Sequence, residues 1–300
     1  MTTGLSKRNS RAQAWFVFSF LAPPVALYAL FVLLPTINAF RYSLTRWDGL
    51  SDPVYVGMRN FRSFLAPGSD FIPAIQHNLF LMLVPGVFIL SLALMFANMI
   101  HQRIKGAKVF RIAFFFPNII SSVAVALLWM LIYSPTKVGL LNHFAAIWFH
   151  RTQPVPYTES SRLLTSLVPM TVWSATGFYM VLFLAAMENI PETYYEAARL
   201  DGAGPTTLFF RITMPMMWEV FTTGVIFLII GGLKYFDAIW VLENGRPKTA
   251  THTMSTLMYS RVFEQYNIGY GTAIAVLLFL LVLIVTVVSR RLLQREALEY

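Results

Sequence analysis

Residues 191–200 combine the signals that start a short helix with a pair of small side chains. Pro191 suits the first turn of a helix, and Glu192 follows it where the positive end of the helix dipole favours an acidic side chain. Ala197 and Ala198 favour helix and leave a low, smooth surface. Such a surface can pack against another molecule, but it offers no side chain for catalysis.

A bend is predicted directly after this helix. Gly202 stands where a helix would end in a left-handed residue, and Pro205 can start a second short helix. The segment 189–215 is therefore predicted to form two short helices joined by a sharp bend. An amphipathic helix lying on lipid headgroups is the alternative that local physics leaves open.

Several kinds of chemistry are excluded by the sequence. It has no cysteine, so disulfides, thiolate metal sites and cysteine nucleophiles are ruled out. None of the five histidines has the spacing of a metal site, and the serines and histidines form no recognisable hydrolase arrangement. No G-x-x-x-x-G-K-[ST] motif is present to cradle the phosphates of ATP. We expect no catalytic residue, metal or cofactor in this chain.

The composition predicts a membrane protein. The chain has 300 residues, of which 57% are hydrophobic and 12% are charged, whereas an ordinary soluble domain is roughly a quarter charged. The net charge of +9 does not indicate nucleic acid, because Lys and Arg collect beside membrane spans for topological reasons. No nucleic-acid partner is expected.

Six apolar stretches are long enough to cross a bilayer, which takes roughly 20 residues of helix. Five contain no charged side chain, and the sixth has Glu219 near its start and Lys234 near its end. We therefore predict an all-α membrane protein with six transmembrane helices. The apolar stretches are 12–40, 71–102, 112–136, 163–187, 217–236 and 265–289.

The ends of these stretches predict the orientation of the chain. The first follows a basic start like that of a signal peptide, but its apolar run is too long and Pro23 and Pro24 interrupt it, so we interpret it as a retained span. The loop 103–111 carries four basic and no acidic side chains. By the positive-inside rule this loop, both termini and the segment 188–216 are predicted to be cytoplasmic.

The segment after 189 also resembles a known motif. Glu196-Ala197-Ala198, then Gly202, then Ile212-x-x-Pro215 matches the EAA loop of ABC-importer permeases, with Met214 where that family usually has Leu. The resemblance implies that this loop inserts into a cleft on a separate ATPase. The residues implied to make this contact are Tyr195, Glu196, Ala197, Ala198, Asp201, Gly202 and Ala203.

The resemblance extends over about 16–292 and is closest to carbohydrate-uptake permeases, in particular the first of their two paired membrane subunits. Segments 43–49, 55–61 and 116–121 are similar to that subfamily, as is 244–247 with Arg246 in place of a Gly. The resemblance implies the type I ABC importer permease fold in a bacterial or archaeal cell (inner) membrane. It also implies a second permease forming a heterodimer, a cytoplasmic ATPase dimer that binds ATP and Mg, an extracytoplasmic solute-binding protein, and a sugar-like solute.

The chain is expected to divide into three parts. Residues 1–70 hold the first span and an outer loop, 71–293 form the permease core, and 294–300 form a cytoplasmic tail. The core spans are predicted at about 78–100, 112–133, 165–187, 217–236 and 271–289.

Polar and aromatic residues inside the spans are candidates for a solute path, because polar groups in a membrane tend to face a cavity or another helix. Lys234 and Asp237 are three residues apart and could pair on one helical face, as an ion pair at the outer end of the span or as a solute contact. Trp173 could equally be an interfacial or packing tryptophan. The candidates are Asn118, Ser122, Trp129, Trp173, Ser174, Phe178, Gly232, Tyr235 and Asp237.

Two other classes of function fit the sequence less well. A stand-alone secondary carrier usually shows carboxylates near mid-membrane, and the middle of every predicted span lacks Asp and Glu. An intramembrane enzyme would need a nucleophile and a base that the sequence does not offer. We therefore predict a translocation subunit rather than an enzyme.

Overall fold

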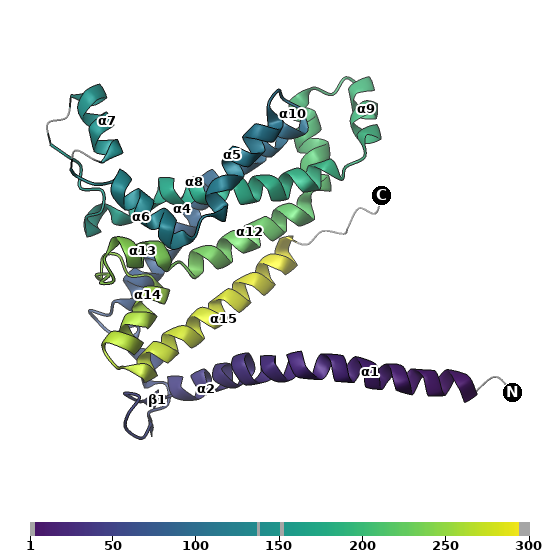
Figure 1. Ribbon diagram of the computed structural model, residues 1–300. Coiled ribbons are helices and arrows are strands. Elements are labelled where there is room, and N and C mark those ends of the chain that lie inside the picture. The colour runs from purple at the N-terminus through teal and green to yellow at the C-terminus, as the bar shows by residue number, and fades with distance from the viewer. Residues whose placement is uncertain (1–3, 137–138, 151–152, 294–300) are drawn as a thin grey trace. The chain divides into compact units, whose positions relative to one another are not determined.

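The computed structural model of the protein describes residues 4–136, 139–150 and 153–293. It divides into two compact units, Met1–Ser63 with Ser260–Val276 (unit 1) and Phe64–Tyr259 with Leu277–Tyr300 (unit 2). Nearly all regular structure in the described residues is helical (Figure 1). The predicted cytoplasmic tail, 294–300, lies outside the described residues.

Unit 1 begins with a long apolar helical run. Helix α1 (Gly4–Tyr28) passes through a π-helical turn, η1 (Ala29–Leu33), into α2 (Leu34–Ser43). Pro23 and Pro24 lie inside α1 without ending it. From Ala14 onwards most side chains of this run are exposed. The first predicted span, 12–40, is thus confirmed as one helical run.

The predicted outer loop of unit 1 is ordered by a short hairpin. Strand β1 (Thr45–Arg46) pairs antiparallel with β2 (Val54–Tyr55), and α3 (Arg59–Ser63) follows. The side-chain amide of Asn60, on α3, donates to the backbone oxygens of Ser43 and Thr45, each at 2.8 Å. The loop is therefore tied back onto the end of α2.

A second contact closes the tip of this hairpin. The Asp48 carboxylate accepts hydrogen bonds from the backbone N–H and the hydroxyl of Ser51 and from the backbone N–H of Leu50, which lowers the pKa of Asp48 to about 2. The backbone N–H of Ile268 donates to the Trp47 oxygen at 3.0 Å. The tip of the hairpin thus meets the start of α15 (Ile268–Leu293), within unit 1.

Unit 2 is built on two long helices that pack along one another. Helix α4 (Phe71–His101) lies against α8 (Ser160–Glu188), α5 (Ala107–Ile119) packs on α8, and α12 (Trp218–Leu233) packs on α4. Small side chains on α4 allow the close approach of large ones on α8. The residues buried at this contact include Ile89, Ala93, Ala97, Met180, Phe183, Leu184 and Met187.

The remaining elements of unit 2 are short and lie between or beyond these helices. Figure 1 shows α7 and α9 at opposite ends of α8. The shorter elements are α6 (Ser122–Ile132), α7 (Leu140–Phe149), α9 (Glu192–Leu200), α10 (Pro205–Leu208), η2 (Phe209–Thr213), α11 (Met214–Met216), α13 (Asp237–Leu242) and α14 (Met254–Tyr259). The π-helical turn η3 (Ser260–Glu264) belongs to unit 1.

The third predicted span, 112–133, is not one continuous helix, so this part of the prediction is wrong. It is a pair, α5 and α6, bent by 99°. Pro117 lies near the end of α5, and Ile120 and Ser121 then take extended backbone conformations, each with ψ 138°. Helix α5 continues past Pro117 to Ile119, so these two residues with ψ 138° are what change the direction of the chain.

Five helices among the described residues are long and apolar enough to cross a membrane, and the bent pair makes a sixth if its halves form one span. The predicted number of spans is therefore confirmed. The helices are longer than the predicted spans. Helix α4 covers Phe71–His101, where 78–100 was predicted, and α8 covers Ser160–Glu188, where 165–187 was predicted. The fifth span ends early as a helix, at Leu233, and a short break precedes α13.

Gly232 lets α12 cross α4 closely. A Cβ atom at this position would lie 2.6 Å from the Met82 Cβ and 2.8 Å from the Met82 Cα. Such distances leave no room for any side chain at Gly232. A Cβ at the neighbouring Gly231, by contrast, would meet nothing within 4 Å.

Candidate functional site

The segment 189–215 forms the predicted short helices α9 and α10. The bend between them is a C-terminal cap of α9 with a residue in the left-handed conformation. Helix α9 ends at Leu200, and Gly202 has φ +79°. The backbone N–H of Ala203 donates to Ala198 O at 2.9 Å, and that of Gly202 donates to Arg199 O at 3.0 Å. These two bonds form a Schellman motif, which needs a left-handed residue at the position of Gly202. Local sequence chemistry alone fixes this bend.

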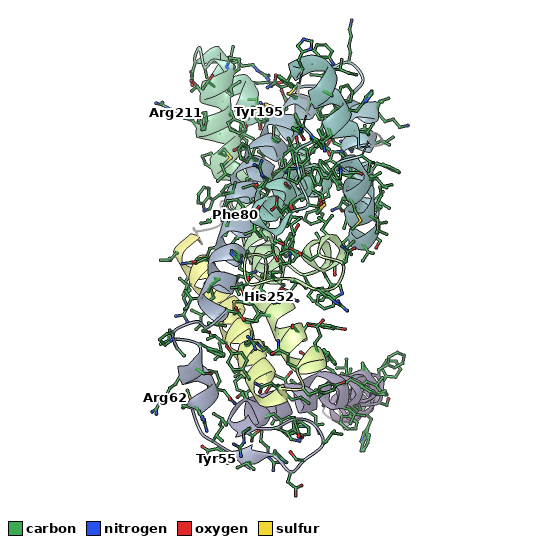
Figure 2. The ribbon with its side chains drawn as sticks, turned by 90° about the vertical axis from the view of Figure 1, so that its left-hand side faces the viewer. Tyr55, Arg62, Phe80, Tyr195, Arg211 and His252 are labelled. Carbon is green, nitrogen blue, oxygen red and sulfur yellow. The ribbon has the colours of Figure 1, made fainter. Side chains whose placement is uncertain are left out.

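The predicted contact residues on α9 do not all face the same way. Glu196, Ala197, Asp201 and Gly202 are exposed, and Ala198 and Ala203 are half-buried. Tyr195 is 4% exposed and points into unit 2. The structure therefore leaves most of this set available to a partner but places Tyr195 on the inner side of α9. Figure 2 shows Tyr195 and Arg211 at one end of unit 2, away from His252.

A cavity of about 570 Å³ lies behind α9. The last residues of α4 with the two that follow it, the inner side of α9, and the segment from Pro205 to Thr213 form its walls. Its polar lining includes Arg103, Arg199 and Glu192, and Arg199 pairs with Glu192 at 2.9 Å. We call this space the α9 cavity.

A second pocket, of about 400 Å³, lies where α5, α6, α8 and α12 meet the break before α13. We call it the span pocket. It gathers residues from three predicted spans, because the bend between α5 and α6 turns their polar residues toward α8 and α12. Five predicted solute-path residues line it, namely Asn118, Ser122, Ser174, Tyr235 and Asp237.

The other four predicted solute-path residues do not line the span pocket. Trp173 packs edge-on against Trp129, with ring centroids 6.1 Å apart. Phe178 packs against Tyr179 and Phe227, and Gly232 lies at the α4 crossing. Trp173 is 38% exposed beside this ring contact, and its place in the solute path stays a prediction.

Hydrogen bonds fix the polar wall of the span pocket. The Ser122 hydroxyl donates to the Asp237 carboxylate, and the hydroxyls of Thr171 and Tyr235 lie 2.9 Å apart. Lys234 also lines the pocket. The predicted pairing of Lys234 with Asp237 on one helical face is wrong, because α12 ends at Leu233. No ion pair joins the two in the part of the chain that the structure describes.

The residue that holds this break in place, Asn78, was not predicted from the sequence. Asn78 is fully buried on α4, and its side-chain amide donates to Gly232 O at 2.7 Å and Leu233 O at 3.0 Å. Its side-chain oxygen accepts from the Met254 N–H at 2.8 Å. An asparagine inside an apolar stretch is the signal that could have found it, because a polar group there must be satisfied.

A further hydrogen bond supports the break from the α14 side. The Thr253 hydroxyl donates to Tyr235 O at 2.7 Å. Together with Asn78 it satisfies backbone oxygens that the end of α12 leaves without helical partners. No group of three His, Asp or Glu residues in 4–136, 139–150 and 153–293 is arranged to hold a metal ion.

Comparison with known proteins identifies the family. The model of a family described as the inner membrane component of binding-protein-dependent transport systems matches residues 14–297. The chain belongs to this family. It is thus a multi-pass permease subunit of an ABC transport system, as the EAA-type loop predicted.

Individual relatives agree with this assignment. The permease is similar to the diacetylchitobiose uptake system permease protein NgcF of Streptomyces coelicolor, with 32% identity over 88% of this chain and 78% of the relative. It is also similar to the sn-glycerol-3-phosphate transport system permease protein UgpA of Yersinia enterocolitica, with 29% identity over 97% of this chain and 98% of the relative.

A solved structure supports the fold. The permease resembles a chain in the crystal structure of a bacterial alginate ABC transporter in complex with an alginate pentasaccharide-bound periplasmic protein. The TM-score is 0.82 at 22% identity, over 97% of this chain and 98% of the other. The predicted ABC importer permease fold is therefore confirmed.

Proposed function

We propose that this permease moves a sugar or sugar-like solute inward as one of two paired translocation subunits of an ABC importer. The observation that carries the proposal is the Schellman-capped helix α9, which leaves Glu196 and Ala197 exposed for a partner. The names of the relatives, which include uptake systems for diacetylchitobiose and glycerol phosphate, support a sugar-like solute.

The proposed assembly divides the work between chains. A second permease completes the pathway as a heterodimer, a binding protein delivers the solute, and an ATPase dimer on the cytoplasmic side binds ATP and Mg. This sequence has no phosphate-binding loop, which supports the assignment of ATP hydrolysis to the partner. Glu196, Ala197, Ala198, Asp201, Gly202 and Ala203 are the residues proposed to meet the ATPase.

The span pocket is the proposed solute path in this chain. Its hydroxyl and phenol groups, on Ser174, Thr171 and Tyr235, can exchange hydrogen bonds with the rim of a sugar. Apolar walls from Met170 and Ala175 can cover the ring face. The Asp237 carboxylate adds an acceptor at the edge of the pocket.

Reconstitution tests this proposal directly. The permease co-expressed with the second permease and ATPase encoded beside it should retain the ATPase through purification, and binding protein with solute should stimulate ATP hydrolysis and uptake in proteoliposomes. Glu196→Lys reverses an exposed charge at the proposed contact and should lower ATPase retention. Uptake that proceeds without ATPase or binding protein would instead support a secondary carrier.

Membrane topology gives a further expected result. The basic loop 103–111 supports cytoplasmic termini and a cytoplasmic α9. In this cysteine-free chain, a membrane-impermeant thiol reagent should label Ser69→Cys and Ser160→Cys in intact cells, and Thr206→Cys only after permeabilisation. Labelling of Thr206→Cys alone in intact cells would reverse the orientation.

A further inference from the structure

Tyr195 is a large polar side chain buried on the inner side of the proposed docking helix, and its one side-chain hydrogen bond reaches a different element. The Tyr195 hydroxyl lies 3.0 Å from the Thr213 hydroxyl oxygen. Both residues are almost fully buried, at 4% and 2% exposed. Because a buried polar pair must satisfy its own hydrogen-bonding groups, this contact is specific in geometry.

The direction of the hydrogen bond follows from the second bond that Thr213 makes. Either hydroxyl can donate in this pair, but both bonds of Thr213 form together only when its single proton goes to Leu208 O, at 3.3 Å, and its oxygen accepts from Tyr195. Tyr195 is therefore the donor. Burial raises the pKa of the Tyr195 phenol, which keeps the proton on the hydroxyl near neutral pH.

Thr213 occupies the joint between the bend after α9 and the fifth span. It is the last residue of the π-helical turn η2, and its backbone oxygen accepts from the Met217 N–H at 3.0 Å. Met217 is 2% exposed and belongs to the core between α4 and α8, and α12 starts at the next residue. A displacement of Thr213 is therefore passed to the first turn of α12.

The other end of α12 reaches the span pocket. Gly231 and Lys234 line that pocket, and Tyr235 follows them in the break that Asn78 and Thr253 hold. The short helix α11 and the 16-residue helix α12 thus join Thr213 to the pocket. Helices transmit displacement along their axis because their backbone hydrogen bonds form one rigid ladder.

The α9 cavity explains why a specific bond is needed at this joint. A cavity of about 570 Å³ lies behind α9, and the Tyr195 ring packs there against His101 at the end of α4, with ring centroids 5.6 Å apart. That ring contact is with α4 and does not tie α9 to η2. Tyr195 and Thr213 both line this cavity. Their hydrogen bond spans its wall and ties α9 to η2.

We propose that the Tyr195–Thr213 hydrogen bond is the link through which movement of α9 is transmitted to α12 and the span pocket. The proposal rests on the proposed function, because it takes α9 as the element that the ATPase moves. It assigns Tyr195 a role different from the exposed residues of α9. Those residues bind the ATPase, whereas Tyr195 is a positioning residue that acts through Thr213.

Two substitutions remove this bond with little change in shape. Tyr195→Phe deletes the donor, and Thr213→Val replaces the hydroxyl with a methyl group. In the reconstituted complex, each should lower the solute moved per ATP hydrolysed by about fivefold, the factor expected for one hydrogen bond. ATPase retention and basal hydrolysis should remain, and the double variant should be no worse than either single one.

Matched variants separate this role from a loss of folding. Thr213→Ser keeps the hydroxyl and should restore the transport ratio. Thr223→Val removes a hydroxyl that bonds only to Glu219 O in its own helix and should leave the ratio unchanged. If Thr213→Val fails to assemble, Tyr195→Phe alone decides the question.

Two results would overturn the proposal. One is an unchanged ratio of solute moved to ATP hydrolysed in Tyr195→Phe. The other is loss of ATPase retention in Tyr195→Phe, since the bond would then serve docking and not transmission. Failure of the proposed function looks different, because wild-type protein would then not retain the ATPase and Glu196→Lys would change nothing.

Discussion

Gly202→Asp is expected to impair solute uptake severely while the protein still inserts in the membrane. Gly202 has φ +79° and carries the Schellman cap of α9. A residue with a Cβ is strained there by about 1–2 kcal/mol. Aspartate also places a charge at the proposed contact with the ATPase, where desolvation of an unpaired charge costs on the order of several kcal/mol. Uptake should fall by about tenfold or more, which about 1.4 kcal/mol already produces.

Neighbouring glycines supply the matched control for this prediction. A Cβ at Gly202 or at Gly204 would meet no atom within 4 Å, but only Gly202 has a positive φ. Gly202→Ala should therefore weaken ATPase retention while Gly204→Ala has little effect. Gly202→Asn should lie between alanine and wild type, since asparagine tolerates the left-handed region better than alanine. Uptake, ATPase activity and co-purification are measured together. Wild-type values for Gly202→Asp would remove this bend from the coupling pathway.

The segment around α9 could be predicted because its shape depends on nearest neighbours in the sequence. Proline, glycine and alanine act through the backbone, so the two helices and the left-handed Gly202 were foreseeable. The inward direction of Tyr195 was not. It depends on which side of α9 meets η2, and that is a tertiary contact with Thr213.

The spans were predictable as segments but not as shapes. Hydropathy detects the length of an apolar stretch, and six stretches gave the observed count. It does not detect two extended residues, so the 99° bend between α5 and α6 was missed. Hydropathy also did not reveal that α12 ends at Leu233. Lys234 and Asp237 therefore do not share one helical face, and the predicted pairing does not form.

The residues of the span pocket were partly predictable. Residue type shows which side chains suit a polar cavity, but the rotation of each helix about its axis decides which of them face it. Trp173 and Ser174 are adjacent on α8, and one residue turns a helix by about 100°. Ser174 therefore lines the pocket while Trp173 packs against Trp129. Asn78 was visible as a polar residue in an apolar stretch, but its three partners come from residues 154–176 positions away.

Gly231→Phe is expected to block solute movement without disturbing the fold. Gly231 is exposed on α12, lines the span pocket, and would place a Cβ in open space. A phenyl group there would project into this pocket of about 400 Å³ and narrow the space beside α12. Uptake should fall by about tenfold or more, while ATPase retention and basal hydrolysis stay near wild type because α9 lies elsewhere in unit 2.

Two alanine variants make this result interpretable. Gly231→Ala adds only a methyl group and raises helix propensity by about 1 kcal/mol, so uptake should be retained and thermal stability should not fall. Gly232→Ala, one residue along, would bring a Cβ to 2.6 Å from Met82 and should impair assembly. Initial uptake rates across solute concentrations, with the yield of assembled complex, distinguish the three variants. If Gly231→Phe transports at the wild-type rate in fully assembled complexes, the solute does not pass the side of the span pocket that Gly231 lines.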